Sequence, residues 1–69
     1  MEDQDLDATM RAAFDTSETE IVALERMIAA CRAQHDDAKA VRLGRQIAGL
    51  RQNLAQRREA WARVKRREQ

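Results

Sequence analysis

Apolar residues follow a seven-residue repeat in two separate stretches of this 69-residue chain. In the second stretch, residues 38–66, they recur mostly at alternating steps of three and four, which is the spacing of a helix that packs lengthwise on another helix. The apolar positions of this predicted helix are Ala40, Leu43, Ile47, Leu50, Leu54, Trp61 and Val64. The pattern therefore predicts a helix with one apolar stripe that needs a partner.

The first stretch carries a matching stripe and ends near Gln34. Its members are Met10, Phe14, Ile21, Leu24, Ile28 and Cys31. Ser17 and Glu20 have the spacing of a capping box, which favours a new helix start at Ser17. Met10 and Phe14 nevertheless extend the same heptad backwards, so residues 6–16 have three alternatives: continuation of the helix, a separate short helix, or disorder. Residues 1–5 are acidic, and we expect them to be frayed.

The repeat loses phase between the two stretches, and this predicts a turn. On one straight helix at about 100° per residue, the stripe around Ile47 would be rotated by roughly 100° from the stripe around Ile28. A reversal at residues 34–37 removes the conflict, and Asp36 or Asp37 can cap the second helix. No glycine is present to provide the left-handed residue that commonly ends a helix.

A reversal near residues 35 and 36 brings the two stripes together in a defined register. The predicted facing pairs are Cys31 with Ala40, Ile28 with Leu43, Leu24 with Ile47, Ile21 with Leu50, Ser17 with Leu54, and Met10 with Trp61. Because nearly every apolar residue meets an apolar partner, the predicted fold is all-α, a single antiparallel helical hairpin over residues 6–67.

A chain this short rarely buries enough surface alone and usually needs disulfides, a metal or a second subunit. Cys31 is the only cysteine, so no disulfide forms within one chain. Its place on the apolar stripe predicts a small buried residue in a reducing compartment. The acidic first residues and the lack of a long apolar run complete the expectation of a cytoplasmic protein that does not enter a membrane.

A second set of small residues in the second stretch repeats every seven positions beside the apolar stripe. Its members are Val41, Ala48, Ala55 and Ala62. Small side chains allow close helix approach, so this edge is the predicted partner or oligomer face. We expect self-association of hairpins, a dimer forming a helical bundle, with docking onto a different helical protein as the rival.

No group of residues has the pattern of a catalytic, cofactor or metal site. His35 stands beside Asp36 and Asp37, but consecutive turn residues do not converge on one metal and no further histidine or cysteine completes a ligand set. Cys31 belongs to the apolar stripe that faces the other helix, which we call the seam, whereas His35 lies in the predicted turn. This separation argues against a catalytic Cys-His pair. We therefore expect a protein that is not an enzyme and binds no cofactor or metal.

Charge is distributed unevenly along the chain. Residues 1–20 carry seven acids and one base, a net charge of −6, whereas residues 51–69 carry seven bases and two acids, a net charge of +5. The candidate contacts to nucleic acid or to an acidic partner are Arg57, Arg58, Arg63, Lys65, Arg66 and Arg67. The hairpin lays these bases beside the acidic first segment, so we expect much of their field to be cancelled.

The length and heptad layout resemble small hairpins that dimerise into four-helix bundles, such as the plasmid-encoded RNA-binding Rop family. The turn followed by Asp37-Ala38-Lys39 is similar to small helical co-chaperones of type III secretion. These resemblances imply a helical hairpin and transfer no residue roles. The predicted function is a small protein–protein interaction module, acting as an adaptor, co-chaperone or regulator; the alternative is a nucleic-acid-binding regulator that uses the basic second helix.

Overall fold

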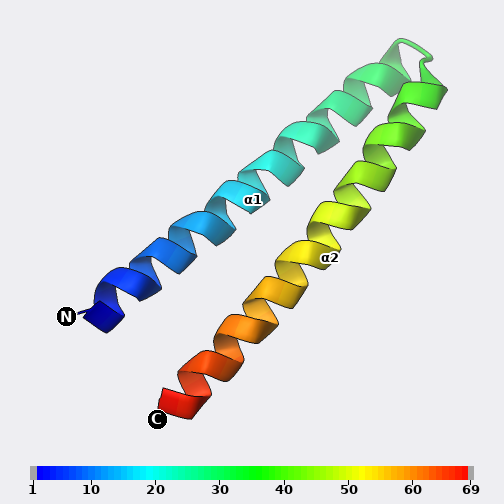
Figure 1. Ribbon diagram of the computed structural model, residues 1–69. Helices are drawn as coiled ribbons and strands as arrows, with labels where there is room; N and C mark the ends of the chain where they lie inside the picture. The colour runs from blue at the N-terminus through cyan, green and yellow to red at the C-terminus, as the bar shows by residue number, and fades with distance from the viewer. Residues whose placement is uncertain (1, 69) are drawn as a thin grey trace.

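Two helices of 32 residues each form an antiparallel hairpin. The computed structural model describes the backbone of residues 2–68 and the side chains of residues 6–67. Helix α1 (Glu2–Ala33) and helix α2 (Asp37–Glu68) lie side by side along the length of the molecule, which measures 51 × 17 × 10 Å (Figure 1). The described residues contain no strand. The predicted all-α hairpin is confirmed.

Helix α1 continues through the segment where a second start was possible. Three hydroxyl groups in this segment donate to the carbonyl oxygen four positions earlier, at 2.9 to 3.2 Å: those of Thr16, Ser17 and Thr19. This back-bonding satisfies the hydroxyl groups inside a helix and needs no free helix end. Ser17 is therefore not a capping residue, and residues 6–16 belong to one continuous helix with the rest of α1.

Helix α1 begins at Glu2, so four of the five residues expected to be frayed have a helical backbone. Residue 1 and the side chains of residues 2–5 lie outside the described part of the chain. Fraying of this segment stays a prediction.

The connection between the helices is a Schellman motif with histidine in the place of glycine. The Asp36 amide donates to the Cys31 carbonyl oxygen at 2.8 Å, and the His35 amide donates to that of Arg32 at 3.0 Å. His35 has a φ of 60°, the left-handed conformation that this motif requires. Asp36 then caps α2, because its Oδ1 accepts from the Lys39 amide at 3.3 Å. The turn thus falls inside the predicted segment without a glycine.

The core is a single line of side chains between the helices. Six residues are buried: Phe14, Ile21, Cys31, Ala40, Ile47 and Leu54. Five further apolar side chains pack against the central cluster of this line: Met10, Leu24, Ile28, Leu50 and Trp61. No described side chain is less than 5% exposed, so even the best-buried members of this seam retain some contact with solvent.

Val64 departs from the predicted seam, because its side chain is 42% exposed. The neighbouring Lys65 reaches across to Asp7 of α1 and places a charged pair at this end of the hairpin. Val64 is not among the apolar side chains that pack against the central cluster. The apolar seam therefore ends near Trp61.

We expect His35→Gly to stabilise the hairpin. A left-handed conformation costs a residue with a Cβ atom roughly 1–2 kcal/mol, and the extra backbone entropy that glycine loses on folding offsets part of the gain. The free energy of unfolding in urea, at one fixed protein concentration, should rise by about 1 kcal/mol. Gln34→Gly is the matched control, since Gln34 does not have a positive φ, and it should give no gain. Equal effects of the two substitutions would contradict this account of the turn.

Candidate protein-interaction surfaces

Ion pairs between the helices line one side of the seam, which we call the ion-pair side. The pairs are Arg51 with Glu25 at 2.9 Å, Arg58 with Glu18, and Lys65 with Asp7 at 2.8 Å. Their side chains remain 25% to 61% exposed, so solvent screens the charges and each pair adds little to the stability of the fold. Paired charges therefore line this flank, which also has a hollow between the helices, bounded by Glu25, Ile28, Arg32, Gly44, Ile47 and Arg51.

The opposite flank, which we call the open side, has a hollow between the helices. Its lining residues are Glu20, Ala23, Leu24, Gln46 and Leu50. Consecutive helix residues point about 100° apart, so Leu24 and Leu50 lie on one flank of the seam while Glu25 and Arg51 lie on the other. Leu24 and Leu50 are only half-buried, so the open side presents the uncovered flank of the apolar seam.

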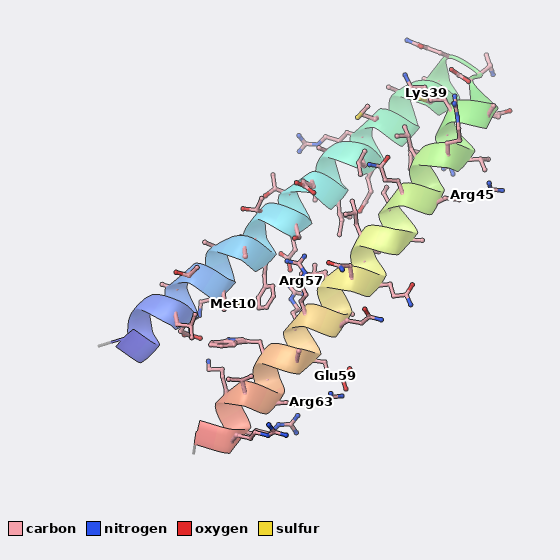
Figure 2. All side chains as sticks on the ribbon, in the orientation of Figure 1. Met10, Lys39, Arg45, Arg57, Glu59 and Arg63 are labelled. Atoms are coloured by element: carbon pink, nitrogen blue, oxygen red, sulfur yellow. The ribbon has the colours of Figure 1, made fainter. Side chains whose placement is uncertain are left out.

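Arg57 enters the seam. Its half-buried side chain points from α2 toward α1 (Figure 2), and its Nη2 donates to the Ser17 hydroxyl oxygen at 2.6 Å. The Nε atom is buried and has no hydrogen-bond partner. Arg57 thus lies between the helices instead of in the basic surface predicted for it, and it takes the place opposite Ser17 that was predicted for Leu54.

The sequence contained a signal for this arrangement. Arg57 stands seven residues after Leu50 and seven before Val64, so it occupies a position of the heptad repeat. Its place in a run of bases favours an exposed charge, whereas its heptad position favours the seam. Ser17 has the spacing of a helix cap and also occupies a heptad position.

The other predicted basic contacts are largely engaged within the chain. Arg58 also lies over the Phe14 ring, 5.7 Å from its centre, and Lys65 lies 5.9 Å from the centre of the Trp61 ring. Cation–π contacts of this kind add to the ion pairs.

Three further bases lie toward the end of α2. Arg63 pairs with Glu59 at 2.6 Å on a face directed away from α1 (Figure 2), and Arg66 Nε donates to the Ala62 carbonyl oxygen at 3.4 Å. Arg67 is exposed. The expectation that the hairpin would set bases beside acids is confirmed by the pairs of Arg58 and Lys65.

Two exposed arginines outside the predicted basic stretch extend the positive surface of α2. Arg42 and Arg45 have no hydrogen bond or ion pair among the described residues, and Arg45 points away from α1 (Figure 2). They lie outside the densest run of bases, residues 57–67, so the density of charge along the sequence does not single them out.

Asp7 is held by charges from both helices. Lys65 Nζ donates to its Oδ1 at 2.8 Å, and Arg11 Nη2 lies 3.0 Å from its Oδ2. The hydrogen bond from Lys65 is the largest cause that lowers the pKa of Asp7 below its ordinary value, and the positive charge of Arg11 adds to it against an opposing effect of burial.

The predicted partner stripe lies on the ion-pair side. Its four members are exposed, Val41 most of all at 55%: Val41, Ala48, Ala55 and Ala62. Ala48 precedes Arg51 by three residues and Ala55 precedes Arg58 by three, so these alanines adjoin the paired arginines. A helix laid on this stripe would have to contact both ion pairs.

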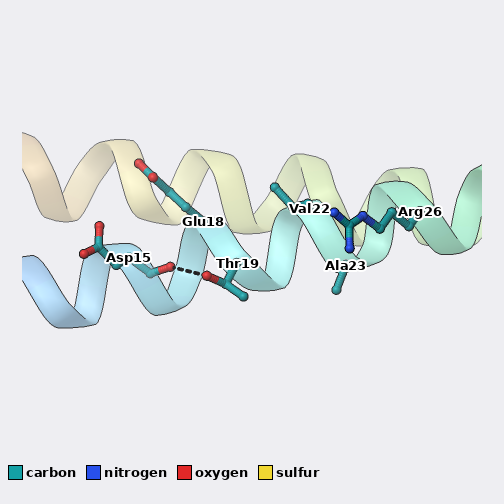
Figure 3. A pocket seen from close by; sticks show the side chains of 6 residues that line it. All are labelled: Asp15, Glu18, Thr19, Val22, Ala23 and Arg26. Carbon is teal, nitrogen blue, oxygen red and sulfur yellow. Dashed lines mark hydrogen bonds between the residues drawn. The ribbon is translucent and has the colours of Figure 1, made fainter.

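Another hollow lies on the outer surface of α1 (Figure 3). It is lined by one helix only, through Asp15, Glu18, Thr19, Val22, Ala23 and Arg26. The Thr19 hydroxyl is used in the bond to the Asp15 carbonyl oxygen, and Glu18 pairs with Arg58. This hollow is an open groove along a helix surface, without side chains that converge from two elements.

The residues considered for metal binding and catalysis are held in structural positions. Cys31 is buried in the seam, while His35 is exposed in the turn. Among the described residues, no three side chains of histidine, cysteine, aspartate or glutamate lie together as metal ligands would. Gly44 and Gly49 sit inside α2, and a Cβ atom on either would meet nothing within 4 Å, so neither serves close packing within the chain.

Neither described helix is long and apolar enough to cross a membrane. No protein-family model, no curated protein and no solved structure matches this chain. The surfaces of the hairpin are therefore the basis for any functional inference.

The pKa of Asp7 should rise toward its ordinary value in the variant Lys65→Met. A carboxyl with a lowered folded-state pKa stabilises the fold above its unfolded-state pKa, and this stabilisation is lost as the pH falls through the folded-state pKa. Titration of the Asp7 carboxyl carbon by NMR measures the shift directly. Arg63→Met is the matched control, because Arg63 pairs with Glu59, and it should leave the Asp7 titration unchanged. An Asp7 pKa that does not respond to Lys65→Met would show that the interhelical pair does not form in solution.

Proposed function

We propose that this chain is a non-enzymatic protein–protein interaction module, an adaptor, co-chaperone or regulator that works as a homo-oligomer through its apolar helix surfaces. The observation that carries the proposal is the amount of surface left uncovered. A folded monomer of 7.9 kDa exposes about 4,400 Å² by the usual scaling with mass, whereas this hairpin exposes 5671 Å². The excess is what a further protein surface would cover.

The exposed apolar side chains support the same conclusion. Five large apolar residues are more than two-fifths exposed: Leu6, Val22, Met27, Val41 and Val64. In a protein without a deeply buried core, coverage of such residues supplies stability that the hairpin alone lacks. A cytoplasmic location is part of the proposal, since the single free cysteine suits a reducing compartment.

The second candidate is nucleic-acid binding, and the exposed arginines of α2 favour it. Arg42 and Arg45 are free of described partners, and Arg66 and Arg67 add positive charge near the end of the helix. Against it, three bases of α2 pair with acids of α1 along the ion-pair side. This pairing reduces the field that a phosphate backbone would meet, and we therefore favour the interaction module.

Self-association should appear in sedimentation equilibrium as a mass of about twice the chain mass, with dissociation and loss of helical circular dichroism on dilution. Leu50→Asp should abolish both association and folding, because it places a charge in the seam and loses packing worth roughly 2–5 kcal/mol. Gln52→Asp is the control at an exposed position of the same helix and should behave as the wild type. A wild-type monomer that keeps its full helicity at every concentration would refute the proposal.

Nucleic-acid binding would give a different pattern. If it occurs, affinity for mixed DNA and RNA should fall steeply with salt, and the triple variant Arg63→Gln, Arg66→Gln and Arg67→Gln should reduce the logarithmic salt slope by about three. Fluorescence anisotropy with labelled oligonucleotides at low salt measures both effects. Absence of any binding at low salt would remove this candidate.

A further inference from the structure

We propose that a second copy of the chain covers the open side of the hairpin, with the two turns at the same end of the dimer. This inference rests on the proposed function, since it assigns the surface and the partner of the self-association. It places the contact on the opposite side of the seam from the stripe of Val41, Ala48, Ala55 and Ala62.

Exposed apolar residues of the open side lie in line with the hollow on both helices. Met27 follows Leu24 by three residues and Glu20 by seven, and Val64 follows Leu50 by fourteen. Met27 is 46% and Val64 is 42% exposed. Apolar side chains thus extend the hollow toward the turn, and beyond the polar pair of Ser17 and Arg57 a further apolar residue, Val64, lies on the same side.

Charge also distinguishes the two sides. A partner on the ion-pair side would have to exclude water from three interhelical ion pairs, and removal of paired charges from water costs more than it returns in most geometries. The hollow of the open side has one charged residue in its lining, Glu20. The open side is therefore the side that a second apolar surface covers at the lower free-energy cost.

The uncovered area fits one partner of the same size. The hairpin exposes roughly 1,300 Å² more than a folded monomer of its mass. A stable protein–protein interface buries about 800 Å² on each partner. The excess is larger than the area that one standard interface covers, so the hairpin has enough uncovered surface for a second copy.

Two hairpins can pair through the same face in two symmetric arrangements, and the net charges of the helices favour one of them. Helix α1 carries eight acids and three bases, a net charge of −5, and α2 carries three acids and ten bases, a net charge of +7. With the turns at opposite ends, α1 would lie on α1 of the second copy and α2 on α2. With the turns together, each α1 lies on an α2 of the other copy.

Like charges placed side by side oppose association, whereas complementary charges favour it and fix the orientation. The arrangement with the turns together places the acidic helix of each copy on the basic helix of the other. It is also two-fold symmetric, so the same surface is used by both copies.

Pulsed electron paramagnetic resonance distinguishes the two arrangements. The variant Cys31→Ala, Gln34→Cys carries one spin label per chain, at an exposed turn position directly after α1. With the turns together, the two labels should lie about 15–25 Å apart, because packed helices are separated by 8–10 Å. With the turns apart, the distance should approach the 51 Å length of the molecule. A distance near the full length would overturn the proposed orientation while leaving self-association intact.

Two matched variants test which side of the hairpin forms the dimer contact. Met27→Lys and Val41→Lys introduce the same charge at exposed apolar positions on opposite sides of the seam, and neither residue is part of the core, so both variants should fold. We expect Met27→Lys to weaken dimerisation at least about tenfold, since it buries an unpaired charge at the contact, and Val41→Lys to leave it nearly unchanged.

Sedimentation equilibrium of both variants beside the wild type gives the comparison. If Val41→Lys alone weakens dimerisation, the contact lies on the ion-pair side and the inference is overturned, although the proposed function would stand. A fully folded wild-type monomer would overturn both.

Discussion

Each helix of this molecule packs against a single neighbour, and this one contact limits how much apolar surface the hairpin can bury. A helix with one partner buries one stripe, and the buried stripe here consists of six residues, of which Ile47 and Leu54 are the least exposed at 5%. The flanks of both helices remain accessible over the 51 Å length of the hairpin. The flanks differ in chemistry: three interhelical ion pairs lie on one side, and the half-buried Leu24 and Leu50 lie on the other.

The polar contact between Ser17 and Arg57 gives the seam its register. An apolar seam with a seven-residue repeat tolerates a slip of one heptad, because similar side chains return to the same place. Such a slip would set Arg57 opposite Met10 or Leu24, neither of which offers an oxygen acceptor to the guanidinium. An unpaired guanidinium between packed helices is costly. The pair therefore opposes the shifted alignments, although the unsatisfied Nε atom shows that the contact itself is imperfect.

The ion pairs and the turn act together with this pair. Glu18 and Glu25 meet arginines that are themselves seven residues apart, Arg58 and Arg51, so a slip of one heptad would keep one of these ion pairs and lose the other. The turn also fixes the register, since the hydrogen bonds of the Schellman motif fix where α1 ends and Asp36 fixes where α2 begins. A histidine in the left-handed position shows that the geometry of this short connection outweighs the preference of the residue for other conformations.

The sequence by itself determined the two helices, the turn segment and the residues of the seam, because each follows from a pattern that repeats within one helix or from the point where the pattern changes phase. Val64 lies beyond the reach of such reasoning: it occupies a position of the heptad repeat, but its burial depends on what the other helix places opposite it. The same holds for Arg57, whose guanidinium is directed by a hydroxyl group on the other helix. Only the tertiary structure decided which bases turn inward, which acids they meet, and which side of the seam carries the ion pairs, since these are contacts between side chains that the local pattern does not relate.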